Sequence, residues 1–219
     1  IPSERIINQV MQDPYYPLAP RYSSRGMVPG ELMNEKDKQE VISNWLNARY
    51  DMVRYVQTLQ NGPKLAKQWR NRLLNPWQFI TVVATANEEV WQHFFSLRNH
   101  KAAQTEIQMV AELAQNVYES SIPQILYAGQ WHTPYVKEQN IVESDLFTVK
   151  TTLEDIYDFQ RKVSVAICAS TSFLNQEEDI PLTKRLELFY RLYNSKPPHG
   201  SPFEHVAQAT ARNVRSGNF

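Results

Sequence analysis

The longest regular pattern in this sequence is a helical spacing of apolar residues between positions 36 and 60. The residues that carry it are Val41, Ile42, Trp45, Leu46, Met52, Val53, Val56 and Leu59. Residues spaced by three or four positions share one face of an α-helix, and Gly62-Pro63 ends the pattern because proline cannot continue a helix. We therefore predict one long amphipathic helix over residues 36–60, which must bury its apolar face against other elements.

Other segments predict further helices and two short strands. Helical periodicity recurs near the N-terminus and over the ranges 64–74, 88–95, 102–118, 153–172 and 183–193. β-branched residues predict a strand over 78–86, and residues 203–211 are a second candidate strand. The mixture predicts a helix-rich α+β fold, in which a small, mainly antiparallel sheet packs against long helices. We predict a single domain over residues 1–219.

The composition is that of an ordinary globular protein, and it excludes some partners. The chain has 219 residues, of which 42% are apolar and 21% are charged. Its 23 basic residues balance its 23 acidic residues, so no overall charge attracts it to nucleic acid or to an anionic membrane. No apolar stretch is long enough to span a bilayer. An anionic ligand would therefore have to be bound by local arginines.

The single cysteine limits the metal and redox chemistry that the chain can carry. One cysteine, Cys168, excludes an internal disulfide framework and a multi-cysteine zinc site. It lies in an apolar run, so we predict a buried, unreactive thiol. Low cysteine usage also points to a reducing compartment, and we expect a cytoplasmic protein without a metal.

Two arginines at predicted helix boundaries are candidate anion ligands. Arg72 lies at the end of a predicted helix, and Arg98 follows the rings of Phe94 and Phe95 on the connection to the next helix. A guanidinium is planar, always charged, and matches a phosphate with two parallel N–H donors. The alternatives are a charge that complements a helix C-terminus for Arg72 and a surface side chain for Arg98. Glu106, in the first turn of the next helix, suits the positive end of the helix dipole.

A polar segment, His199-Gly200-Ser201-Pro202-Phe203-Glu204-His205, is a third candidate. Its spacing is not that of a helical zinc site, and no nucleophile elbow supports a serine hydrolase. If the segment is extended, Phe203 and His205 share one face and Glu204 lies on the other. The alternative is a structural histidine–glutamate pair at the start of a strand.

A run of small hydroxyl residues, Ala169-Ser170-Thr171-Ser172-Phe173, lies at a predicted helix end. Such residues are common caps, but they also let a cofactor phosphate approach the backbone closely. Both interpretations remain open from the residues alone.

These segments together resemble the flavin-dependent thymidylate synthases, also described as thymidylate synthase complementing proteins. Phe94 to Gln108 is similar to that family's F-L-x-L-R-x-x-x-x-A-Q-x-E-I segment, and Arg72 with Pro76 resembles its R-x-x-L-P segment. The polar segment from His199 to His205 is similar to the family's H-x-[ST]-P-F-E-H. Residues 169–173 look like its A-R-x-S-F segment.

The resemblance implies a substrate, cofactors and roles for these residues. Arg72 and Arg98 would contact dUMP, and the FAD contacts would come from Asn87, Ser172, His199, Ser201 and Glu204. The implied reaction transfers a one-carbon unit from methylenetetrahydrofolate to C5 of dUMP, with NADPH as co-substrate and no protein nucleophile. The family's sites form between subunits of a homotetramer.

The chain departs from the family pattern in three ways. Ser170 stands where the A-R-x-S-F arginine would be. The two arginine segments precede the flavin segments, so the chain resembles a circularly permuted, phage-type member, which also carries Trp131-His132-x-Pro134-Tyr135. The signature R-H-R-x-x-S-x-N-x-x-S-x-R is absent. We therefore expect these residues to be part of a longer enzyme that is incomplete here at both ends.

Two other functions remain open at this point. The first is a non-catalytic relative that binds a nucleotide or serves as an assembly subunit, which Ser170 and the absent signature favour. The second is a helical interaction module whose aromatic residues form a core or an interface, namely Trp45, Tyr50, Tyr55, Trp69 and Trp91.

Overall fold

The structure is a computed structural model, and it describes residues 2–25, 30–136, 152–171 and 180–210. The chain divides into two compact units. The first contains residues 1–80 and 87–121, and the second contains residues 81–86 and 122–219. The single domain predicted over residues 1–219 stays a prediction.

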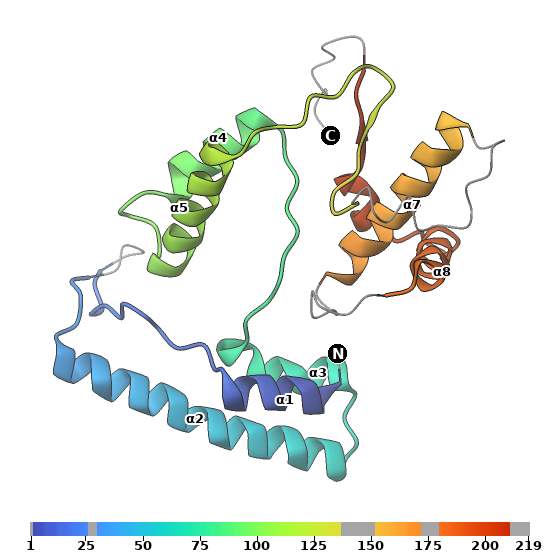
Figure 1. Ribbon diagram of the computed structural model, residues 1–219. Coiled ribbons are helices and arrows are strands. Elements are labelled where there is room, and N and C mark those ends of the chain that lie inside the picture. The colour runs from blue at the N-terminus through green and yellow to red at the C-terminus, as the bar shows by residue number, and fades with distance from the viewer. Residues whose placement is uncertain (1, 26–29, 137–151, 172–179, 211–219) are drawn as a thin grey trace. The chain divides into compact units, whose positions relative to one another are not determined.

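The first unit is built on the long helix that the sequence predicts. This helix, α2, spans Glu35–Asn61 (Figure 1). It begins where the side chain of Asn34 accepts a hydrogen bond of 2.9 Å from the backbone N–H of Asp37, and it ends at Gly62. The predicted boundaries of 36 and 60 are therefore confirmed to within one residue.

The core of this unit lies between α2, helix α1 (Ser3–Gln12) and a 3₁₀ helix, η1 (Asn71–Trp77). Its buried residues are Ile6, Val10, Val53, Val56, Leu74 and Trp77. The indole N–H of Trp77 donates to the backbone carbonyl of Trp45 at 2.9 Å, so the largest side chain of the core also satisfies its polar atom.

The helix predicted over 64–74 is broken into two pieces. A short helix, α3, spans Lys67–Arg70, and η1 follows it directly. In a continuous α-helix, the ring of Pro76 would clash with the carbonyl of Arg72, so the chain adopts the tighter 3₁₀ form instead.

The strand predicted over 78–86 does not form. These residues are extended, but no strand among the described residues pairs with them. The side chains of Ile80 and Val82 are 78% and 69% exposed. β-branched residues favour a strand only where a neighbouring strand and a buried face are available, and here this segment passes from one unit into the other.

A helical hairpin completes the first unit. Helix α4 spans Glu88–Arg98 and helix α5 spans Thr105–Ser120, which confirms the two predicted helices. Phe95 is buried between them, with its ring centroid 5.6 Å from the centroids of Trp91 and Tyr118.

Tyr15 ties this hairpin to the loop that follows α1. Its hydroxyl donates to the Glu106 carboxylate at 2.7 Å, and its ring packs edge-on against Trp45 and Phe79. Burial, together with the hydrogen bond to Glu106, raises the pKa of Tyr15 to about 12. The phenol therefore stays protonated and keeps donating throughout the physiological range. Glu106 lies in the first turn of α5, as the sequence predicts.

The second unit pairs two helices with a small sheet. Helix α7 (Leu153–Ser170) packs against α8 (Leu182–Tyr193), and a 3₁₀ helix, η2 (Ser201–His205), packs against α7 (Figure 1). Strands β1 (Trp131–His132) and β2 (Ala207–Gln208) pair antiparallel, with Trp131 opposite Gln208. The prediction of a helix-rich α+β fold with a small antiparallel sheet is confirmed.

Helix α7 supplies the core of this unit. A capping box between Thr152 and Asp155 begins it. Its buried side chains include Phe159, Val163, Val165, Ala166 and Cys168. Burial raises the pKa of the Cys168 thiol, which fits the predicted unreactive cysteine.

No helix in the described part of the chain has the length and apolar character needed to cross a bilayer.

Candidate functional site

Arg72 lies on the surface of the first unit, in η1. Its guanidinium carbon is 5.0 Å from the centroid of the Trp69 ring, which holds the side chain by a cation–π contact. The backbone beneath it is fixed by Leu74, which is completely buried. The Arg72 guanidinium is therefore exposed to solvent, while the backbone that carries it packs against the core through Leu74.

Arg98 is the last residue of α4, whereas the sequence predicted it on the connection after that helix. It is exposed, and its position adds positive charge at the negative end of the helix dipole. The next residue, Asn99, donates its side-chain amide to Gln115 of α5 at 3.0 Å. This hydrogen bond and the buried Phe95 attach the end of α4 to α5. The backbone that carries Arg98 is therefore packed, although its side chain is exposed.

Asn87 has a structural role at the beginning of α4. Its side-chain oxygen accepts the backbone N–H of Val90 at 2.9 Å, which is an N-cap. Its amide group remains exposed. The flavin contact that the resemblance implies would have to use that amide.

The polar segment from His199 to His205 lies in the second unit. Its last five residues, Ser201–His205, form the 3₁₀ helix η2, so the extended arrangement considered for Pro202–His205 is not the one that forms. Pro202 near the start of η2 explains the difference, because its fixed φ suits the first turn of a helix. The strand predicted over 203–211 shortens accordingly to Ala207–Gln208 among the described residues.

The side chains of this segment divide between the surface and the interior. His199, Ser201 and Glu204 are exposed, and no described residue forms a hydrogen bond with their side chains. Phe203 points inward, with its ring centroid 5.5 Å from that of Phe189. His205 contacts the hydroxyl of Thr85 through Nδ1 at 3.0 Å, and the alternative of a structural histidine–glutamate pair finds no support among the described residues.

The structure describes residues 169–171 of the hydroxyl run. Ser172 lies outside the described residues. Ser170 is buried, and its hydroxyl donates to the carbonyl of Ala166 at 2.7 Å. Ser170 therefore closes the end of α7 and cannot replace the arginine of the family pattern. Three cations from α8, Lys184, Arg185 and Arg191, line a cavity of about 450 Å³ together with Ser170 and the carboxylate of Glu187.

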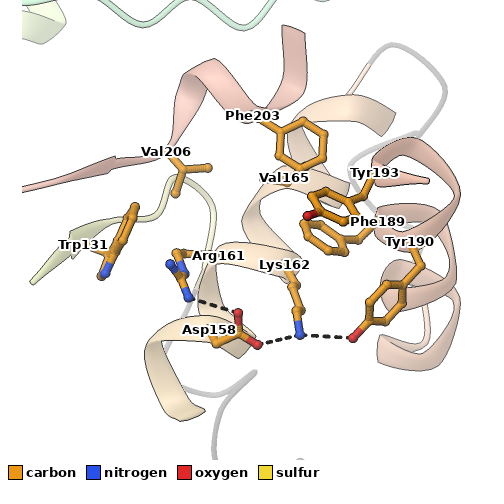
Figure 2. Close-up of a pocket in the computed structure, with 10 residues that line it drawn as sticks. All are labelled: Trp131, Asp158, Arg161, Lys162, Val165, Phe189, Tyr190, Tyr193, Phe203 and Val206. Atoms are coloured by element: carbon orange, nitrogen blue, oxygen red, sulfur yellow. Dashed lines mark hydrogen bonds and ion pairs between the residues drawn. The ribbon is translucent and has the colours of Figure 1, made fainter. Parts of the chain in front are cut away.

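A second cavity, of about 470 Å³, lies between α7, α8, η2 and the small sheet (Figure 2). Its aromatic lining consists of Trp131, Phe189, Tyr190, Tyr193 and Phe203. Because Phe203 belongs to the polar segment, the cavity lies directly beneath that segment.

Charged residues of α7 form another part of this cavity's wall. Asp158 accepts from Arg161 at 3.0 Å and from Lys162 at 2.5 Å. Lys162 also donates to the hydroxyl of Tyr190 at 3.0 Å. The hydrogen bonds to Asp158 and Tyr190 raise the pKa of Lys162, so this amine stays charged.

Sequence reasoning did not single out Arg161 and Lys162. Two adjacent cations with an aspartate three and four positions earlier are a common solvent-exposed helical pattern, so the sequence gives no sign of a cavity. Only the packing of α8 and Trp131 against α7 encloses them. Among the described residues, no group of acidic, histidine or cysteine side chains is arranged to hold a metal ion.

Comparison with known proteins finds a family match, which lies within the first 124 residues. The family model of the thymidylate synthase complementing protein matches residues 18–124, a range that includes Arg72, Asn87 and Arg98. No curated protein and no solved structure matches the chain. Residues 18–124 therefore match the thymidylate synthase complementing protein family, which confirms the resemblance seen in the sequence. The match supports a function related to thymidylate synthesis.

Proposed function

We propose that this chain belongs to a cytoplasmic, FAD-dependent enzyme that transfers a one-carbon unit from methylenetetrahydrofolate to C5 of dUMP, with NADPH as reductant. The observation that carries the proposal is the family match, because it includes both candidate arginines. Both side chains are exposed, and the backbone of each packs against buried residues. Neither guanidinium forms an ion pair with a described residue. We further propose a homotetramer.

The roles of the arginines follow from their chemistry. Arg72 and Arg98 would hold the phosphate of dUMP or polarise the uracil carbonyls. Donors held in place before the reaction stabilise negative charge that develops on the pyrimidine ring. The fixed backbones around Leu74 and Phe95 would provide that preorganisation.

The residues of the polar segment fit a flavin in their chemistry. His199, Ser201 and Glu204 offer donors and acceptors that no described residue uses. A side chain added at Gly200 would meet nothing within 4 Å, so there is open space beside the segment. When bound, FAD would supply hydride chemistry, while these residues would bind and orient it. Lys184, Arg185 and Arg191, which line a cavity with Ser170 and Glu187, would supply the positive charge that Ser170 lacks.

The presence of a flavin is the direct test of this function. The full-length protein should carry FAD after purification, or take it up when FAD is added, and should then show flavin absorbance in the visible range. Protein that is colourless and also fails to take up FAD would exclude the proposed enzyme. That result would favour a non-catalytic nucleotide-binding subunit, which the buried, hydrogen-bonded Ser170 already makes the second candidate.

Arg98→Ala should weaken the binding of dUMP. A hydrogen bond to a charged group contributes about 1.5–3 kcal/mol, so the dissociation constant should rise by roughly 10-fold to 150-fold. Isothermal titration of dUMP into the full-length protein measures this change. Arg54→Ala is the matched control, because Arg54 is also an exposed helical arginine and its side chain is 70% exposed. Equal dUMP affinity in the two variants would refute the role of Arg98.

A further inference from the structure

We propose that Trp69 is a positioning residue for the binding of dUMP, because its ring fixes the direction in which Arg72 presents its guanidinium. The proposal rests on the dUMP site of the proposed function. It assigns a role to a side chain that the sequence resemblance leaves without one. Trp69 does not touch the substrate and acts only through Arg72.

The packing of the first unit does not account for the place of Trp69. Tryptophan is on average a well-buried residue, yet the side chain of Trp69 in α3 is 62% exposed. Trp77, by contrast, is 5% exposed and belongs to the core. The Trp69 ring contacts the Arg72 guanidinium, whose carbon is 5.0 Å from the ring centroid and so within the range of about 6 Å over which a cation–π attraction acts. The contact therefore contributes to the placement of Arg72 and not to the burial of the indole.

The two residues between Trp69 and Arg72 are anchored to helix α1. The hydroxyl of Ser3 accepts a hydrogen bond of 2.8 Å from Nε of Arg70 and donates one of 2.6 Å to the side-chain oxygen of Asn71. Ser3 itself is buried. The backbone from Trp69 to Arg72 is therefore held against α1, and this attachment sets where the ring and the guanidinium meet.

The indole restricts Arg72 without using its charge or its donors. An exposed arginine samples many rotamers, and ordering such a side chain when a ligand binds costs conformational entropy. A ring that already holds the guanidinium reduces this cost. Arg72 forms no ion pair with a described residue, so no described carboxylate has to leave before an anion binds. A cation–π contact also consumes no hydrogen-bond donor, and the N–H groups of Arg72 remain available to a phosphate or a carbonyl.

Tyr55 in α2 provides a matched control within the same unit. Its side chain is 51% exposed, and its ring centroid lies 5.9 Å from the guanidinium carbon of Arg54. Arg54, however, already pairs with Asp51 at 3.0 Å. Tyr55→Leu therefore removes an exposed ring beside an arginine that has no place in the proposed dUMP site.

Trp69→Leu should weaken the binding of dUMP roughly twofold to fivefold, which is the contribution expected of a cation–π contact at an exposed site. Isothermal titration of dUMP into the full-length protein measures this change. Trp69→Phe keeps an aromatic face and should retain most of the affinity, whereas Tyr55→Leu should bind dUMP as the unaltered protein does. Thermal unfolding should change little in all three variants, because both rings are exposed.

The double variant separates a positioning role from a direct contact with the substrate. If Trp69 acts through Arg72, adding Trp69→Leu to Arg72→Ala should lower the dUMP affinity no further. A further loss in the double variant would overturn the positioning role. Equal dUMP affinity in Trp69→Leu and Tyr55→Leu would overturn it as well.

These outcomes are distinct from a failure of the proposed enzyme. A protein that takes up no FAD but binds dUMP with an affinity that depends on Trp69 through Arg72 would support the positioning role and contradict the enzyme. A protein that takes up FAD and binds dUMP equally well with and without the Trp69 ring would support the enzyme and contradict the positioning role. Failure of the unaltered protein to bind dUMP would overturn both.

Discussion

Leu74→Ala should destabilise the first unit by about 2–5 kcal/mol, because it leaves a cavity at a fully buried position. Leu74 packs in the core with Val53, Val56 and Trp77. A 3₁₀ helix carries it, and Pro76 restricts how far that backbone can move to fill the space. Urea unfolding followed by tryptophan fluorescence measures the loss, since Trp45 and Trp77 lie in or beside this core.

The neighbouring residue provides the control for this experiment. Leu73 is 37% exposed, so Leu73→Ala removes the same atoms from a position that is already partly in water. We expect a clearly smaller change in the urea midpoint for Leu73→Ala. If the two variants unfolded at the same urea concentration, η1 would not be packed as the structure shows.

Phe95→Ala should cost about 3–5 kcal/mol in the stability of the α4–α5 hairpin. Phe95 is 4% exposed, and its ring contacts Trp91, Phe94 and Tyr118. The same side chain supports the last turn of α4, which carries Arg98. We therefore expect Phe95→Ala to lower protection of the α4 amides in hydrogen exchange as well as global stability.

Leu97→Ala tests whether this effect depends on burial. Leu97 lies on the same turn of α4 but is 52% exposed. Its truncation should change stability by a small fraction of the Phe95 effect. Comparable losses in the two variants would show that α4 packs through a different face from the one described here.

The helices were predictable because their signals are local. The long run of spaced apolar residues predicted both ends of α2 to within one residue, and Gly62 follows its last residue as expected. α4, α5, α7 and α8 likewise follow from helical periodicity. The strand predicted over 78–86 does not form, because a strand needs a neighbouring strand to pair with. The local sequence does not indicate whether such a neighbour will be present.

The candidate site was predictable only in part. Motif resemblance singled out Arg72 and Arg98, which both lie within the residues 18–124 that the family model matches, and their role stays a prediction. The structure added what holds them, which is the buried Leu74 beneath one and the buried Phe95 beneath the other. It also showed that Ser170 turns inward to bond its own helix, which no motif indicates.

The sequence by itself determined most of the helical segments, the buried cysteine and the resemblance to the family that residues 18–124 match. Tertiary structure alone decided that Ser201–His205 forms a 3₁₀ helix and not a strand. It also decided that the Arg161 guanidinium lies over the Trp131 ring, with the aromatic rings of α8 nearby. The physical reason is the range of the interactions. Periodicity and capping act within a few turns, whereas a cavity forms from side chains that are brought together by packing across more than seventy positions, from Trp131 to Val206.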